Sequence, residues 1–375
     1  MKLLSLDLEK LVFKTLVYSS ILVFTKLMPV SPIYPIYVVC ILVFYSILRK
    51  ASSEFVNVIV ILNYMTVFAV VVQFYKSDAS ALVNLIFSLQ ALSIMLSLSY
   101  RFTEKELINV AISYCYLCTF LISIDSLYRL SHPIVPTESQ LAAYERRNTV
   151  FYLYKYNSLM FGSSNTTALV ALSNFFLLLF ISDRTNKNYF LLKIVLLAVL
   201  FFTFSRAAIA SAIIALLLLY SFRIGFIAVA LGSVFALNIG MLVYHTTEDL
   251  SLKSKFHIIT EVLSYYQNNF SLELLLTGVG LSRSPELIGI SAHNIFISYG
   301  FELGLVGIGL LLFLILTSIR LSRLHAVYLW YPILISGLSY FIYAGAPFFF
   351  VPLALIVIIS SKRTTFFTGR FYKNY

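Results

Sequence analysis

Residues 190–220 read FLLKIVLLAVLFFTFSRAAIASAIIALLLLY, an apolar run whose main break is the pair Ser205-Arg206. One helix of this length would be too long for a bilayer core of about 30 Å. Divided at Ser205-Arg206, the run gives two short helices of about 21 to 24 Å each. This hairpin also leaves the flanking basic residues Arg184 and Arg223 on the same side of a membrane. The stretch therefore predicts two paired spans joined by a tight turn.

The rest of the chain repeats this pattern. Of its 375 residues, 60% are hydrophobic and 11% are charged, and the charges collect in short clusters between apolar runs. We therefore predict an all-α polytopic membrane protein, a single integral membrane domain over residues 1–375 without a soluble domain. About twelve spans are expected, at residues 15–28, 33–48, 55–75, 80–99, 107–127, 165–182, 189–204, 207–221, 224–243, 294–318, 327–343 and 347–360.

Lysine and arginine residues set the expected orientation, because short loops rich in them stay in the cytoplasm. With both termini inside, most of the basic residues fall on cytoplasmic segments. The formal net charge of +11 is then explained by topology. It gives no reason to expect a nucleic acid as partner.

Two of the expected outer loops are long, at about residues 128–164 and 244–292. Long loops beside minimal connections usually line a site. In the second loop, apolar residues recur at helical spacing: Leu252, Phe256, Ile259, Leu263 and Tyr266. They predict an amphipathic helix at the outer surface, where capping the bundle and gating a lipid substrate are equally good explanations.

Polar residues open the last long apolar run. If a helix begins near Asn294, then Asn294, Ser298 and Glu302 form one polar stripe. The imidazole of His293, at the mouth, can accept a proton near neutral pH, although a histidine is also common at a membrane interface. Glu302 would lie about 13 Å deeper, so anchoring a neighbouring helix or loop is favoured for it over catalysis.

Arg206 would lie at the tight outer turn of the hairpin. A guanidinium there needs a partner, and phosphate is its best bidentate match, while snorkelling or a protein carboxylate is the alternative. Asn165 follows two serines at the start of a span, where the helix N-terminus could bind an anion or could simply be capped. Gly278 and Gly280 form a turn before Arg283.

No group of cysteines and histidines has the spacing of a zinc site, and no dense set of carboxylates suggests a divalent cation. We therefore expect neither a metal nor a cofactor. A cationic, outward-facing site with one base suits a lipid-linked pyrophosphate donor, whose leaving group needs only charge stabilisation.

Four stretches together resemble the O-antigen polymerase and O-antigen ligase superfamily of bacterial inner-membrane glycosyltransferases. They are Gly162–Asn165, TFSRAAIA around Arg206, LLTGVGL at 275–281 and AHNIFISYGFELGLVG at 292–307. They cover the middle and last thirds of the chain, with the long outer loop between the second and the third. The resemblance implies a GT-C-like fold and a periplasmic site that transfers an undecaprenyl-diphosphate-linked glycan to an acceptor hydroxyl without a metal.

Carried over to this chain, the resemblance makes His293 the general base and Arg206 the residue that holds the donor pyrophosphate, in one shared outward pocket. Arg283, Arg146 and Arg147 would add positive charge, and Asn165 and Asn294 would also bind substrate. Of the members, the polymerase is favoured over the ligase, and a lipid-linked oligosaccharide transporter is the competing class. The expected partners are lipid-linked donor and acceptor glycans, membrane lipids and a chain-length regulator.

Overall fold

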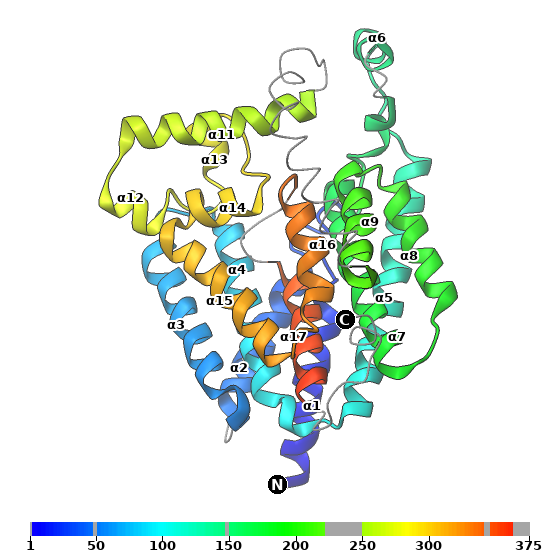
Figure 1. Ribbon diagram of the computed structural model, residues 1–375, viewed down its shortest axis with the longest axis vertical. Helices are drawn as coiled ribbons and strands as arrows, with labels where there is room; N and C mark the ends of the chain where they lie inside the picture. Colours follow the sequence, from blue (N-terminus) through cyan, green and yellow to red (C-terminus); the bar gives the residue numbers. More distant parts are fainter. Residues whose placement is uncertain (1, 48–50, 147–149, 222–249, 341–345, 363–375) are drawn as a thin grey trace.

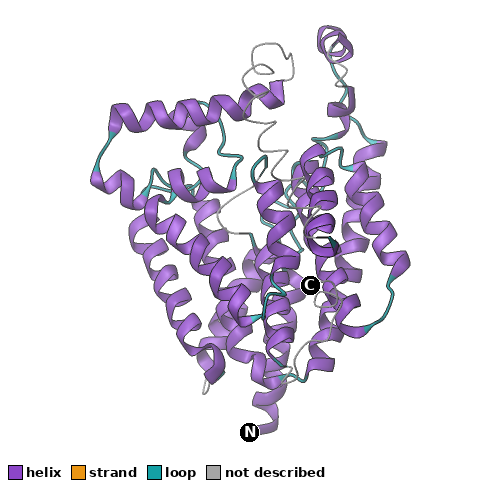
Figure 2. Cartoon of the chain, in the orientation of Figure 1, coloured by secondary structure: helices purple, strands orange, loops and turns teal. Residues whose placement is uncertain are grey.

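A computed structural model of the chain describes residues 2–47, 51–146, 150–221, 250–340 and 346–362. All regular secondary structure within them is helical, as the composition predicts (Figure 2). The longer helices are α1 (Lys2–Ser19), α2 (Ile33–Ile47), α3 (Val56–Gln73), α4 (Ala79–Leu98), α5 (Glu104–Ser131), α7 (Ser164–Thr185), α8 (Phe190–Phe202), α9 (Arg206–Tyr220), α11 (Leu250–Asn269), α15 (Gly304–Leu321), α16 (Val327–Gly337) and α17 (Pro347–Ser361).

Several helices have the length and composition of membrane spans. Within the described residues, five segments are long and apolar enough to cross a bilayer: Ser53–Gln73, Ala79–Arg101, Glu104–Ser131, Ser164–Thr185 and Gly304–Leu321. Five shorter apolar helices accompany them: α2, α8, α9, α16 and α17. The chain is therefore a helical membrane protein, and the predicted span at 224–243 lies outside the described residues.

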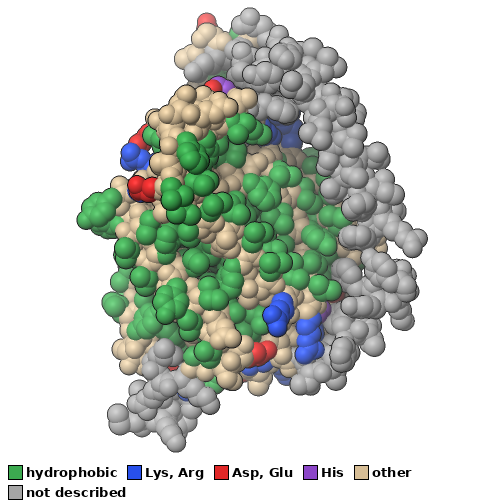
Figure 3. Space-filling model, turned by 60° about the vertical axis from the view of Figure 1, so that its left-hand side comes forward, with side chains coloured by type: hydrophobic (Ala, Val, Ile, Leu, Met, Phe, Trp, Pro, Cys, Tyr) green, Lys and Arg blue, Asp and Glu red, His purple; other side chains and the backbone are tan. Residues whose placement is uncertain are grey.

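The bundle is built around α7 and α4, whose apolar windows are 94% and 83% buried. Helix α7 packs against α5, α8, α16 and α17, and α4 packs against α3, α1 and α17. By contrast, only 17% of the window that ends in α3 is buried, so α3 lies at the outer edge. On this side of the molecule, hydrophobic side chains cover the middle and charged ones lie toward its upper and lower margins (Figure 3). This is the surface expected of a bundle in lipid.

The hairpin predicted from residues 190–220 is present. Helix α8 ends at Phe202 and α9 begins at Arg206. Between them Phe204 has a φ of 53°, in the left-handed region, which reverses the chain direction. The two short helices and the position of the break between them are therefore confirmed.

The first predicted span, 15–28, is wrong, because the helix covers Lys2–Ser19 instead. Its charged first half is stabilised by partners from α5 and the turn before it. Glu9 accepts from the guanidinium of Arg101, and Lys10 Nζ lies 2.6 Å from a carboxylate oxygen of Glu106. Hydropathy alone places a span over the apolar residues and does not register such pairs.

The short helices α12 (Leu272–Thr277), α13 (Ser284–Ile288) and α14 (Ile295–Ile297) lie with α11 across one end of the bundle, opposite the N-terminus (Figure 1). We call this the α11 end. The helix predicted in the second long loop is α11, but Ile259 and Leu263 of its predicted apolar face are 48% and 57% exposed, whereas the neighbouring Ile258 is buried. The first long loop rises at the same end and contains α6 (Glu138–Arg146) and the 3₁₀ turn η3 (Val150–Tyr154).

Candidate functional site

The polar stripe expected along one helix is broken into three pieces. Helix α14 is followed by a π-helical turn, η4 (Ser298–Glu302), and only then by α15, so the continuous span 294–318 is wrong. The break comes at Gly304, whose φ of 69° lies in the left-handed region. The hydroxyl of Ser298 donates to the carbonyl of Ala292 at 3.0 Å rather than pointing along a stripe.

The loop Gly278–Gly280, which follows α12 and which we call the glycine loop, packs directly on this break. Gly278 also has a φ of 69°, and an added Cβ there would lie 2.4 Å from the backbone of Glu302. The N–H of Val279 donates to the carbonyl of Phe301 at 3.0 Å, and that of Gly280 to the carbonyl of Glu302 at 2.9 Å. Two motifs that are separate in the sequence are thus joined backbone to backbone, an approach that only glycine permits.

Glu302 ties the same region to α13. Its carboxylate accepts a hydrogen bond from the hydroxyl of Ser284 at 2.5 Å, and the Glu302 side chain is almost fully buried. This contact holds the start of α13 against the π-helical turn before α15.

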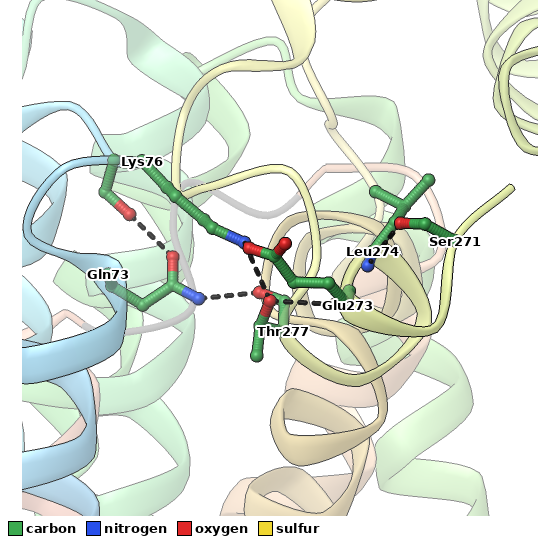
Figure 4. A network of polar contacts seen from close by, with 7 residues as sticks. Gln73, Lys76, Ser271, Glu273, Leu274 and Thr277 are labelled. Carbon is green, nitrogen blue, oxygen red and sulfur yellow. Dashed lines mark hydrogen bonds and ion pairs between the residues drawn. The ribbon is translucent and has the colours of Figure 1, made fainter. Parts of the chain in front are cut away.

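The loop between α3 and α4 holds the glycine loop from the other side (Figure 4). Nε2 of Gln73 donates to the carbonyl of Thr277 at 2.6 Å. Nζ of Lys76 donates to Oγ1 of Thr277 at 2.9 Å and pairs with the carboxylate of Glu273. These contacts fix the end of α12, from which the glycine loop continues to its backbone contacts with Phe301 and Glu302.

A cavity of about 180 Å³ lies beneath α11. Its walls come from α11, from the segment around α14 and from the chain just after α16. The lining residues are Lys255, Ile258, Ile259, His293, Asn294, Ile297, Leu338 and Ser339. A mostly apolar cavity with a few convergent polar groups is the usual form of a ligand site.

His293 lines this cavity at its mouth, and its side chain is exposed. Its ring stacks on that of Tyr340, with centroids 5.4 Å apart and planes inclined by 27°. Burial by the surrounding groups lowers the pKa of His293 below its ordinary value, and the positive charge of Lys255 lowers this pKa further. The imidazole is therefore neutral at neutral pH, the form that accepts a proton.

Asn294 is occupied by structural contacts. Its side-chain oxygen accepts hydrogen bonds from the N–H groups of Phe296 at 2.8 Å and Ile297 at 3.4 Å, which caps α14. Its amide nitrogen donates to the carbonyl of Leu338 at 3.0 Å. The residue predicted to bind substrate thus also fixes the backbone next to His293.

Arg206 begins α9 and is exposed at the same end of the bundle. Helix α16 packs against α9 and also contacts α14 (Figure 1). Neither Arg206 nor Arg283 lines the cavity that contains His293. The single pocket expected for His293 and Arg206 is therefore not found: the cavity at His293 is not shared with Arg206, and α16 lies between α9 and the segment that carries His293.

Of the other predicted arginines, Arg283 does not line this cavity. The guanidinium of Arg283 pairs with the carboxylate of Glu286 at 2.8 Å, three residues on. Arg146 is the last residue of α6 in the first long loop. Arg147 lies outside the described residues.

Asn165 is the second residue of α7 and is half-buried. The start of this helix reaches the cavity through Tyr340. The hydroxyl of Tyr340 lies 3.3 Å from Oγ of Ser163 and 3.2 Å from Oγ1 of Thr166. Two of the motifs resembling the superfamily, at 162–165 and 292–307, are thus bridged by one tyrosine that the sequence did not single out.

A buried carboxylate that sequence reasoning missed holds the end of the first long loop. Asp125 of α5 is 1% exposed. Its Oδ1 accepts hydrogen bonds from the hydroxyl of Ser158 and from the N–H groups of Leu159 and Met160, at 2.7 to 3.1 Å. Its Oδ2 accepts from Oγ1 of Thr167 at 3.1 Å. A lone acid inside an apolar span was the available signal for this residue.

Arg129 of α5 is fully buried near the hairpin turn. It donates to the carbonyls of Tyr154 at 2.6 Å and Phe202 at 2.8 Å. The second contact satisfies a carbonyl at the end of α8 and fixes the turn that leads to Arg206.

Among the residues that the structure describes, no three His, Cys, Asp or Glu side chains cluster as metal ligands would. Comparison with known proteins finds no matching family, no matching curated protein and no matching solved structure.

Proposed function

We propose that the chain is an O-antigen polymerase of the bacterial inner membrane, with both termini cytoplasmic. It would be an inverting, metal-independent glycosyltransferase that joins undecaprenyl-diphosphate-linked repeat units on the periplasmic face. The observation that carries the proposal is the position of His293, in a cavity under an amphipathic helix at one end of an apolar bundle. A base placed there can serve a hydroxyl whose carrier lipid stays in the bilayer.

In the proposed reaction, the imidazole of His293 takes the proton of the acceptor hydroxyl while its oxygen attacks the anomeric carbon of the donor. As the new C–O bond forms, the bond from that carbon to the pyrophosphate oxygen breaks, and undecaprenyl diphosphate leaves with the electron pair. Attack from the face opposite the leaving group inverts the configuration. Arg206 would bind the departing pyrophosphate, and Arg283, Arg146 and Arg147 would add positive charge.

The position of α16 limits how the donor can bind. Because α16 lies between α9 and α14, a pyrophosphate held by Arg206 has to lie near the C-terminal end of α16 for its sugar to reach His293. Leu338 and Ser339, just beyond that end, already line the cavity. We therefore propose that the anomeric carbon of the donor lies next to Leu338 and Ser339.

Deletion of the gene tests the proposed function. Lipopolysaccharide that carries a single repeat unit is the result expected of a lost polymerase. Complete loss of O-antigen with polymer retained on the lipid carrier would instead identify a ligase, and repeat units held at the cytoplasmic face would identify a transporter. Unchanged chain length would reject all three.

Replacing Arg206 with alanine should lower the elongation rate by about 10²- to 10³-fold, as loss of a group that stabilises transition-state charge typically does. Arg206→Lys should recover little of this rate, because an ammonium cannot grip two phosphate oxygens at once. The measurement is the chain-length distribution at matched membrane levels of protein. Arg320→Ala, which removes an exposed charge at the opposite end of α15, serves as control. If the Arg206→Ala variant makes glycan chains of wild-type length, Arg206 has no role in the mechanism.

The pH dependence of elongation should follow the imidazole. Because His293 must be neutral to accept a proton and its pKa is lowered, the rate should rise with pH, and the midpoint of the rise should lie below the ordinary histidine value of 6.5. Lys255→Met removes a positive charge beside the ring. This removal stabilises the protonated imidazole and raises its pKa, so the rising limb should move to higher pH. Initial rates of reconstituted protein between pH 5 and 8 measure this limb. Lys255→Arg keeps the charge and should leave the limb in place, and a limb unaffected by Lys255→Met would contradict the assignment.

A further inference from the structure

Tyr340 connects three parts of the chain at the cavity. It follows the end of α16, and its ring stacks on His293 of the segment before α14, with ring centroids 5.4 Å apart. Its hydroxyl lies 3.3 Å from Ser163 and 3.2 Å from Thr166 at the start of α7. One side chain thus contacts the imidazole with its face and a buried helix start with its hydroxyl.

The chemistry of Tyr340 suits support rather than proton transfer. Burial raises the pKa of its phenol, although the hydroxyls of Ser163 and Thr166 oppose this change. The phenol therefore stays protonated at neutral pH and keeps a hydrogen to donate to α7. Its ring remains a neutral aromatic surface.

We propose that Tyr340 is a positioning residue that fixes the plane of the His293 imidazole and ties it to α7 through Ser163 and Thr166. The face of the Tyr340 ring restricts rotation of the His293 imidazole and also affects its protonation. When the imidazole takes a proton, the resulting cation is attracted by the electron-rich face of the tyrosine. The stack therefore favours the protonated imidazole, which counters the burial and the charge of Lys255.

The groups that affect this equilibrium come from two directions. Lys255 approaches from α11, and Tyr340 approaches from the end of α16. The two oxygens from α7, on Ser163 and Thr166, do not titrate and act only on the phenol. Loss of the aromatic face and loss of the hydroxyl should therefore have separable effects on His293.

Two substitutions separate the face from the hydroxyl. Tyr340→Phe keeps the stack and loses the tie to α7, so the pKa of His293 should stay near the wild-type value while kcat falls on the order of tenfold through misplacement. Ser163→Ala combined with Thr166→Ala should reproduce this result. Tyr340→Leu keeps apolar bulk and loses the stack, so kcat should fall further and the pKa of His293 should drop. KM should change little in either variant.

The pKa of His293 can be measured without the reaction, by NMR titration of the full-length protein with labelled histidine rings. The signal is assigned by its loss in His293→Ala. Tyr75→Phe is the control, because Tyr75 is 91% exposed. Matching size-exclusion profiles establish that the variants fold.

The inference rests on the proposed function only for its kinetic part, so the two can fail separately. A lowered His293 pKa in Tyr340→Leu without any polymerising activity in the wild type would support the coupling and reject the polymerase. An active polymerase whose rate and His293 titration are both unchanged in Tyr340→Leu would overturn the positioning role and leave the proposed function intact.

Discussion

Replacement of His293 by alanine is expected to lower the elongation rate by about 10²- to 10⁴-fold, the usual contribution of a general base. The imidazole lines the cavity under α11 and is neutral at neutral pH, so its removal takes away the group proposed to accept the proton. Binding should be retained, because Asn294 and its contacts to α14 and Leu338 are untouched. The loss should therefore appear in kcat more than in KM.

The measurement is the growth of glycan chains on reconstituted protein supplied with lipid-linked repeat units. His257→Ala is a matched control, since this exposed histidine lies on α11 and pairs only with Glu261 at 3.4 Å among the contacts described. Equal rates in the two variants would mean that His293 is not the base.

A second large effect is expected from the glycine contact below the cavity. Gly278→Ala combines a φ of 69° with a Cβ placed 2.4 Å from the backbone of Glu302. Left-handed strain and overpacking each cost about 1 to 3 kcal/mol. Together they should destabilise the fold enough to separate the glycine loop from the start of α15.

The chain offers controls for each part of that effect. Gly289 has a φ of 71° with nothing within 4 Å of an added Cβ, so Gly289→Ala measures backbone strain alone. Gly309 lies in α15 with open space around it, and Gly309→Ala should be neutral or stabilising by up to about 1 kcal/mol. In thermal unfolding in detergent, the midpoint temperature should be highest for Gly309→Ala, lower for Gly289→Ala and lowest for Gly278→Ala. A Gly278→Ala midpoint equal to that of Gly289→Ala would show that the loop can move aside.

The sequence predicts those parts of the fold that depend on local pattern. The hairpin break before Arg206 follows from length and one charged residue, and α11 follows from helical spacing of apolar residues. The first span was misplaced because ion pairs to Glu9 and Lys10 come from segments far away in the chain. The break at Gly304 was missed because the glycine's use depends on its neighbour, Gly278, across a tertiary contact.

The candidate site divides in the same way. His293 and Glu302 could be named from the sequence because titratable groups are rare in apolar runs. Tyr340 could not, because it is one of 26 tyrosines and only the stack on His293 distinguishes it. Arg206 was placed at the correct turn, but the position of α16 relative to it depends on helix packing, which no local pattern encodes.

The shortness of α8 and α9 has a consequence for the surrounding bilayer. With 13 and 15 residues, they are about 20 and 22 Å long at 1.5 Å per residue, less than the roughly 30 Å of hydrocarbon in a typical membrane. Phe190, Leu191 and Phe201 of α8 are exposed and would face lipid. Hydrophobic mismatch on this flank should thin the adjacent leaflet, so that phosphate groups of carrier lipids descend toward Arg206 without leaving the membrane.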